Sequence, residues 1–102
     1  MLEKLAYSLG RNDEEPNIDL AKKLVKSKNK KGIKEIVNVL SNSKEQIAND
    51  CIKVLYEIGE LEPKLISEYA GDFIQLLQSK NNRLVWGAMT ALSKIVSHNP
   101  DE

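Results

Sequence analysis

Two stretches of the chain carry the same apolar pattern, and their spacing constrains the fold more than any other feature of the sequence. Residues 47–58 and 84–95 align at a shift of 37 residues without a gap. The matched apolar positions are three or four residues apart, the spacing of one face of an α-helix. They are Ile47, Cys51, Leu55 and Ile58 in the first stretch and Leu84, Ala88, Leu92 and Ile95 in the second. A repeated amphipathic helix predicts a stack of similar helices.

The repeat extends backward from these stretches, which makes its unit a helical hairpin. The same shift lays Ile36-Val37 on Phe73-Ile74 and Val39-Leu40 on Leu76-Leu77. A shift of 31 residues lays Leu5, Leu9, Leu20, Ala21 and Leu24 on Ile36, Leu40, Cys51, Ile52 and Leu55. The first copy is shorter and less regular, as a terminal cap should be. We therefore expect a single domain over residues 1–102, with repeats at about 2–27, 32–59 and 63–97.

Local signals divide these repeats into six expected helices, at 2–9, 16–25, 33–40, 44–58, 62–77 and 82–96. Gly10 and Gly59 are placed to stop helices, and Ser43 to cap the fourth. Gly71 is a point where the fifth helix can kink or divide, and Asn99-Pro100 ends the sixth. The β-branched run 33–40 also fits a strand, but its stripe has helical spacing.

Composition indicates a folded domain and excludes several classes of protein. Of 102 residues, 41% are hydrophobic and 29% charged, which excludes disordered and low-complexity chains. Lys plus Arg equals Asp plus Glu at 15 each, so the whole chain has no net attraction to nucleic acid or an anionic membrane. No apolar run approaches the roughly 20 residues of a membrane span, and Met1 leads into Glu3 and Lys4 rather than a signal sequence. A soluble cytoplasmic protein is expected.

No group of residues indicates catalysis, so we predict a protein that is not an enzyme and needs no cofactor. One cysteine, Cys51, and one histidine, His98, are too few for a structural zinc site. The acids at 57, 60 and 62 surround a predicted turn with no second catalytic group beside them. The sequence has no phosphate-binding loop or nucleophile elbow. No catalytic, metal-binding or cofactor-binding residue is therefore predicted.

The hairpin pattern resembles the HEAT repeat, a member of the armadillo-type superhelices. The final helix of that repeat is matched here by Leu84, Ala88, Ala91, Leu92, Ser93 and Ile95. Val85 and Ala48 stand where the family usually has Arg, and Asn81 stands near its usual Asp; those residues form a polar ladder between repeats in the family. The resemblance implies an all-α solenoid of about three hairpins. The second helix of each hairpin would line a concave binding face.

This alignment also names the outward positions of the second helices. Three equivalent sets result: Ile18, Asn49 and Trp86; Lys22, Lys53 and Thr90; Lys26, Glu57 and Lys94. We expect a non-catalytic scaffold that binds a protein or peptide on this face. The predicted partner-binding residues are Trp86, Asn49, Lys53, Thr90, Lys94, Lys22 and Lys26. Trp86 is either an exposed aromatic anchor or a residue packed against an adjacent helix or a further repeat.

Three alternatives remain open at this point. The first is phosphate or nucleic-acid binding through a basic stripe, which consists of the lysines at 22, 23, 26, 28, 30, 31 and 34 together with Lys53. The same stripe could instead bind an acidic peptide, or the lysines could form a solvated face. No aromatic residue is interleaved among them to stack on bases. The second is a fragment of a longer array, because residues 99–102 resemble a turn into another hairpin. The third is self-association through the last hairpin.

Overall fold

The computed structural model describes residues 1–41 and 44–98, and every regular element in these ranges is helical. Five α-helices are present: α1 (Glu15–Ser27), α2 (Lys30–Asn38), α3 (Glu45–Leu61), α4 (Ala70–Leu76) and α5 (Asn82–His98). Three short 3₁₀ turns accompany them: η1 (Leu2–Lys4), η2 (Pro63–Leu65) and η3 (Ser67–Tyr69). The prediction of an all-α protein is confirmed, and residues 33–40 contain helix rather than strand.

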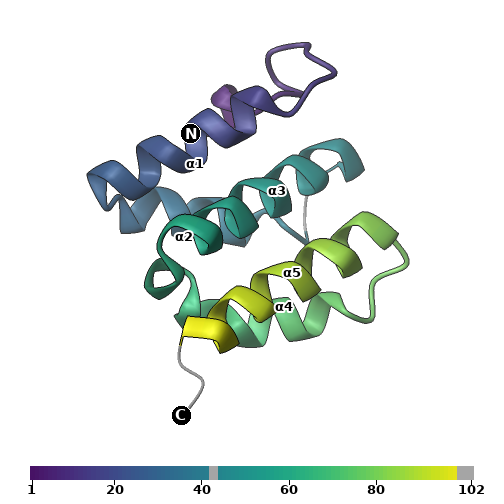
Figure 1. The fold of residues 1–102 in the computed structure, drawn as a ribbon. Coiled ribbons are helices and arrows are strands. Elements are labelled where there is room, and N and C mark those ends of the chain that lie inside the picture. Colours follow the sequence, from purple (N-terminus) through teal and green to yellow (C-terminus); the bar gives the residue numbers. More distant parts are fainter. Residues whose placement is uncertain (42–43, 99–102) are drawn as a thin grey trace.

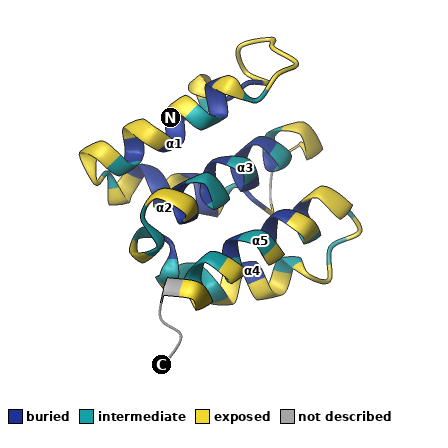
Figure 2. Ribbon diagram, in the orientation of Figure 1, coloured by how far each residue is buried: buried dark blue, intermediate teal, exposed yellow. Residues whose placement is uncertain are grey.

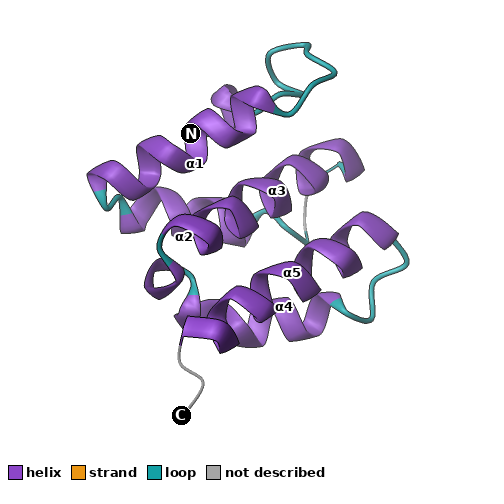
Figure 3. Cartoon of the chain, in the orientation of Figure 1, coloured by secondary structure: helices purple, strands orange, loops and turns teal. Residues whose placement is uncertain are grey.

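The α-helices form two layers, and the first layer holds the three longest. Helices α1, α3 and α5 lie side by side, with α3 packed between the other two (Figure 1). Helices α2 and α4 form the second layer, where α2 packs on α3 and α4 packs on α5. The smallest dimension of the molecule, 21 Å, is that of two helices of roughly 10–12 Å diameter. Lys28 and Asn29 alone join α1 to α2, and residues 77–81 join α4 to α5, whereas a longer loop precedes α1 (Figure 3).

The core lies between the layers and along the sides where first-layer helices meet (Figure 2). Its members come from the apolar face of every helix; they include Leu20, Leu24, Ile33, Ile36, Leu55, Ile58, Phe73, Leu84 and Ala88. Gly87 allows a close approach between α5 and α3. A Cβ atom built on Gly87 would lie 2.5 Å from Cγ1 of Ile52, so α5 approaches α3 at a distance only glycine permits.

The predicted helix at residues 2–9 is wrong, and buried polar side chains explain the difference. The backbone at Leu5 is extended, with φ −71° and ψ 153°, so η1 and the turn after it are separate. The Asn17 side chain accepts the Ala6 N–H at 2.9 Å, and the Asp50 carboxylate accepts the Tyr7 N–H at 2.7 Å. Asn17 Nδ2 also donates to Asp50 at 2.9 Å. These side chains of α1 and α3 thus bind backbone donors of the N-terminal segment.

Gly10 does end this segment, as predicted. Its φ is +70°, a conformation in which glycine has no steric penalty. The Gly10 N–H donates to the Tyr7 carbonyl at 3.0 Å, and the Arg11 N–H donates to the Ala6 carbonyl at 2.9 Å. This pair of bonds is the Schellman arrangement that closes helical turns.

Gly59 does not stop a helix, which is a second correction. Helix α3 continues through it to Leu61. Gly59 is buried, and a Cβ atom there would lie 2.8 Å from Cδ1 of Ile66 and 3.2 Å from Cβ of Lys94. The glycine therefore allows Ile66, the residue after η2, and Lys94 of α5 to pack closely against α3.

The predicted helix at 62–77 is divided, though not at Gly71. Two 3₁₀ turns occupy its first half, and α4 begins only at Ala70, so Gly71 lies in the first turn of α4. Ile66, at the junction of the 3₁₀ turns, is fully buried against Gly59. The structure thus has five α-helices in its described ranges where six were expected. The predicted Ser43 cap and the Asn99-Pro100 helix end lie outside the described residues.

No helix in the described part of the chain is both long and apolar enough to cross a membrane.

Candidate partner-binding surface

A groove on the outer side of the first layer brings together four of the predicted partner-binding residues. Asn49 and Lys53 of α3 and Trp86 and Thr90 of α5 line it. Tyr56 of α3 and Arg83 of α5 complete the rim, while Ile52 and Gly87 form the floor. The volume of the groove is about 190 Å³. We call these eight residues the α3–α5 groove.

Helical spacing places these side chains on facing sides of the groove. Asn49, Lys53 and Tyr56 are four and three residues apart, and Arg83, Trp86 and Thr90 are three and four apart. Each set therefore lies along one side of its helix. Gly87 permits the close approach to Ile52 that brings the two sides together. The sequence named Asn49 and Trp86 through the repeat alignment, but gave no separate signal for Tyr56 or Arg83.

Trp86 is the dominant exposed group of the groove. Its relative exposure is 67%, so the possibility that it packs within the described domain is excluded. The Thr90 hydroxyl donates to the Trp86 carbonyl at 2.9 Å, a bond that involves only the main chain of Trp86. Within the described ranges, its indole N–H has no hydrogen-bond partner. The side chain is thus available both as an apolar surface and as a hydrogen-bond donor.

The charged end of Lys53 is held in place by neighbouring side chains of α3. Its Nζ atom lies 2.7 Å from Oε2 of Glu57 and 4.9 Å from the centre of the Tyr56 ring. Only 14% of its side chain is exposed. Burial alone would lower the pKa of Lys53, but the hydrogen bond to Glu57 and the neighbouring Tyr56 raise it above its ordinary value overall. Lys53 therefore keeps its charge while it supports the groove wall.

Hydrogen bonds and an ion pair fix the end of the groove that Asn49 and Arg83 form. Asn81 Nδ2 donates to Oδ1 of Asn49 at 2.8 Å, and Asn81 Oδ1 accepts the Arg83 N–H at 3.0 Å. Asn81 thus ties the start of α5 to α3. The Arg83 guanidinium lies 3.2 Å from the Glu14 carboxylate, which precedes α1. A second hollow of about 390 Å³ begins here and shares Asn49 and Arg83 with the α3–α5 groove.

The remaining predicted residues lie elsewhere. Lys94 pairs with Glu60 near the far ends of α5 and α3. Lys22 is exposed on α1 and lines none of the hollows described here. Lys26 lines a separate hollow beside α1. Because Lys53 is paired with Glu57, it does not extend the lysine cluster of α1 onto α3.

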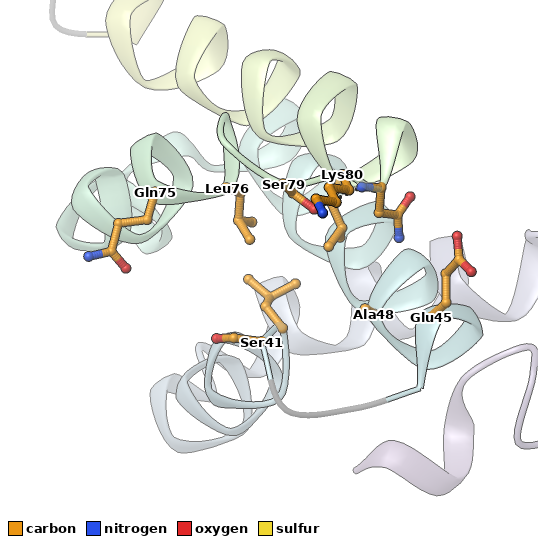
Figure 4. A pocket seen from close by; sticks show the side chains of 10 residues that line it. Ser41, Glu45, Ala48, Gln75, Leu76, Ser79 and Lys80 are labelled. Carbon is orange, nitrogen blue, oxygen red and sulfur yellow. Dashed lines mark hydrogen bonds between the residues drawn. The ribbon is translucent and has the colours of Figure 1, made fainter.

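A larger hollow of about 640 Å³ lies at the side where α2 and α3 face α4 and α5 (Figure 4). Its lining includes Glu45 and Ala48 of α3 and Gln75 and Leu76 of α4. The close view shows Gln75 and Glu45 at opposite ends of the hollow, with Leu76 between them. The polar groups do not converge on one point, so the hollow resembles a contact surface more than a site for a small molecule.

Cys51 is a core residue, as predicted. The residue is fully buried, and burial, with a contribution from Asp50, raises the pKa of its thiol to about 12. The thiol is therefore protonated at neutral pH and is a poor nucleophile or metal ligand. Among the residues that the structure describes, no three His, Cys, Asp or Glu side chains gather closely enough to hold a metal ion.

Searches against protein-family models, curated proteins and solved structures found no match to this chain.

Proposed function

We propose that this chain is a short HEAT-like solenoid that acts as a non-catalytic scaffold and binds a protein or peptide across the α3–α5 groove. The observation that carries the proposal is the exposure of Trp86, the sole tryptophan, at 67%. Large aromatic side chains are usually buried, because leaving them in water forgoes roughly 1.5–3 kcal/mol of apolar burial. An exposed tryptophan beside a preformed groove is typical of an interface anchor.

The composition of the groove supports the same function. Trp, Tyr and Arg are the residues most enriched at the energetic centres of protein interfaces, and the groove contains one of each: Trp86, Tyr56 and Arg83. Its walls are preorganised, because Lys53 is fixed by Glu57 and Asn49 by Asn81. A partner would lose little free energy in ordering these side chains.

The arrangement of the helices supports the solenoid part of the proposal. Helices α1, α3 and α5 are the second helices of the three predicted hairpins, and they lie side by side in one layer (Figure 1). The bond between Asn81 and Asn49 joins two successive second helices near the position of the family's polar ladder. On the HEAT resemblance, the outer side of this layer would be the concave binding face.

The test is selection of binders from a randomised peptide library displayed on phage, followed by titration of the selected peptides. We expect Trp86→Ala to weaken binding by about 30-fold, the loss of about 2 kcal/mol typical of an aromatic hot spot. Met89→Ala is the matched control, because Met89 is 47% exposed on the same helix but does not line the groove. Equal affinity of the Trp86→Ala variant and the unchanged protein would refute the proposal.

A further inference from the structure

A second surface, at the opposite side of the stack from α5, has a different chemistry. It is a hollow of about 530 Å³ beside α1, lined by Lys4, Lys23, Lys26, Leu20, Leu24 and Met1 together with Ser27 and Asn29. We call it the α1 hollow. It shares no lining residue with the α3–α5 groove. A ligand of one surface therefore need not contact the other.

The side chains that line the α1 hollow carry a net positive charge. Its lining has three lysines and no acid. Two of them, Lys23 and Lys26, belong to the seven lysines at positions 22–34, every one of which is exposed. None of the seven takes part in an ion pair within the described residues. Such a one-signed cluster attracts acidic ligands and speeds their association.

The nearest acids do not reverse this charge. Glu3 and Glu35 pair with the N-terminal ammonium group of Met1, at 2.6 and 3.5 Å, rather than with a lysine of the hollow. Glu3 and Asp19 line an adjoining hollow on the other side of Lys4 and Lys23, toward the loop before α1. The positive side of the surface thus faces the turn between α1 and α2, near which Lys26, Lys28, Lys30 and Lys31 lie.

The floor of the α1 hollow is apolar. Leu20 and Leu24, only 3% and 2% exposed, close its bottom, and the Met1 side chain and the aliphatic stems of Lys23 and Lys26 form its more accessible apolar walls. Its lining has no aromatic side chain on which a nucleic-acid base could stack. A surface that only bound phosphate would gain nothing from an apolar floor. The combination fits a ligand that carries both acidic and apolar groups.

We propose that the α1 hollow docks an acidic segment of a partner protein in which leucine-like side chains stand among Asp and Glu residues. The apolar side chains of the segment contact the Met1 side chain and the lysine stems above Leu20 and Leu24, and its carboxylates pair with Lys4, Lys23 and Lys26. This site is additional to the α3–α5 groove and does not depend on Trp86.

The experiment is a fluorescence anisotropy titration with a short labelled peptide in which leucines alternate with Glu and Asp. Lys23→Glu/Lys26→Glu reverses two exposed charges of the α1 hollow, and we expect it to weaken binding by at least about tenfold. The matched control is Lys44→Glu/Lys64→Glu, which makes the same change in net charge at exposed positions outside the hollow and should alter binding by less than about twofold. Thermal unfolding checks that both variants remain folded.

Two further probes separate the proposal from its alternatives. Replacing each leucine of the peptide by serine should also weaken binding by at least about tenfold, because the apolar floor is then unused. Labelled single-stranded and duplex DNA should bind more weakly than the leucine-containing peptide. Tighter DNA binding with a steep salt dependence would assign the lysines to nucleic acid and overturn the proposal. The proposal also fails if peptide affinity is unchanged in Lys23→Glu/Lys26→Glu or if the peptide does not bind.

Discussion

At the scale of single residues, Asp50 determines how the start of the chain is attached to the helices. It is 9% exposed, and its two carboxylate oxygens accept from the Tyr7 N–H and from Asn17 Nδ2. Asn17 in turn accepts the Ala6 N–H. Hydrogen bonds to a buried carboxylate are stronger than neutral ones, and their donors become costly when left unpaired. Two side chains thus replace a turn of helix as acceptors for the N-terminal segment.

We expect Asp50→Ala to lower the free energy of unfolding by about 3 kcal/mol, since the buried Asn17 amide and the part-buried Tyr7 N–H lose their acceptor. Urea denaturation followed by circular dichroism measures this change. Asp72→Ala is the control; Asp72 is exposed, and its loss should cost less than about 0.5 kcal/mol. A loss below about 1 kcal/mol for Asp50→Ala would mean that water replaces the carboxylate at this site.

At the scale of elements, glycines inside helices decide how closely α3, α5 and η2 approach one another. Gly87 and Gly59 each face an isoleucine at a distance that a Cβ atom would not tolerate. Gly71, also within a helix, has open space where its Cβ would lie. The same residue type therefore supports helix contact at two positions and only weakens a helix at the third.

Substituting alanine at Gly87 and at Gly71 should change the free energy of unfolding in opposite directions. Gly87→Ala should lower the free energy of unfolding by about 2 kcal/mol, because the clash with Ile52 outweighs the gain in helix propensity. Gly71→Ala should raise it by about 0.5–1 kcal/mol, because only the propensity changes. Chemical denaturation of both variants measures these shifts. Stabilisation by Gly87→Ala would show that α5 moves away from α3 without cost.

The apolar pattern of the sequence predicts most of the helices, but it fails at the start of the chain. Apolar spacing predicted α1, α3 and α5 because each presents one continuous face to the core. The same pattern failed at residues 2–9, where the backbone donors bind to Asn17 and Asp50, two polar residues without periodicity. The prediction that Gly59 ends a helix was wrong, because glycine both ends helices and allows close contact between them.

The candidate site was partly predictable for a related reason. Aligning the repeats found Asn49, Lys53, Trp86 and Thr90, because equivalent helix positions share one outward direction. Tyr56 and Arg83 lie on the same sides of α3 and α5 but had no distinguishing feature in the sequence. The pairing of Lys53 with Glu57 left the lysine cluster confined to the region of α1 and α2. Charge pairing of this kind depends on side-chain geometry that residue spacing does not specify.

At the scale of the whole molecule, the two ends of the helix stack differ in chemistry. Lysines cover the end at α1, whereas the end at α4 and α5 exposes large apolar side chains. Ile74 is 56% exposed, Leu77 39%, Met89 47% and Val96 63%. Clusters of exposed apolar side chains on a soluble domain often mark contact surfaces. We therefore expect the last hairpin to be the surface through which the protein self-associates.

We expect the molar mass measured by light scattering to rise with protein concentration, because association buries these side chains. Met89→Lys/Val96→Lys should keep the monomer mass of about 11.5 kDa over the same range. Ser93→Lys/Ser97→Lys, at exposed polar positions of α5, makes the same change in net charge and is the control. A constant monomer mass for the unchanged protein would show that this surface stays solvated.

The exposed position of Trp86 also determines what the intrinsic fluorescence of this protein can report. Because the only indole is already in water, unfolding moves it from solvent to solvent and should change its emission colour little. Contact with a ligand in the α3–α5 groove would instead shift the emission to shorter wavelength and shield the ring from acrylamide. The fluorescence of Trp86 should therefore report binding in the groove while changing little in wavelength when the protein folds.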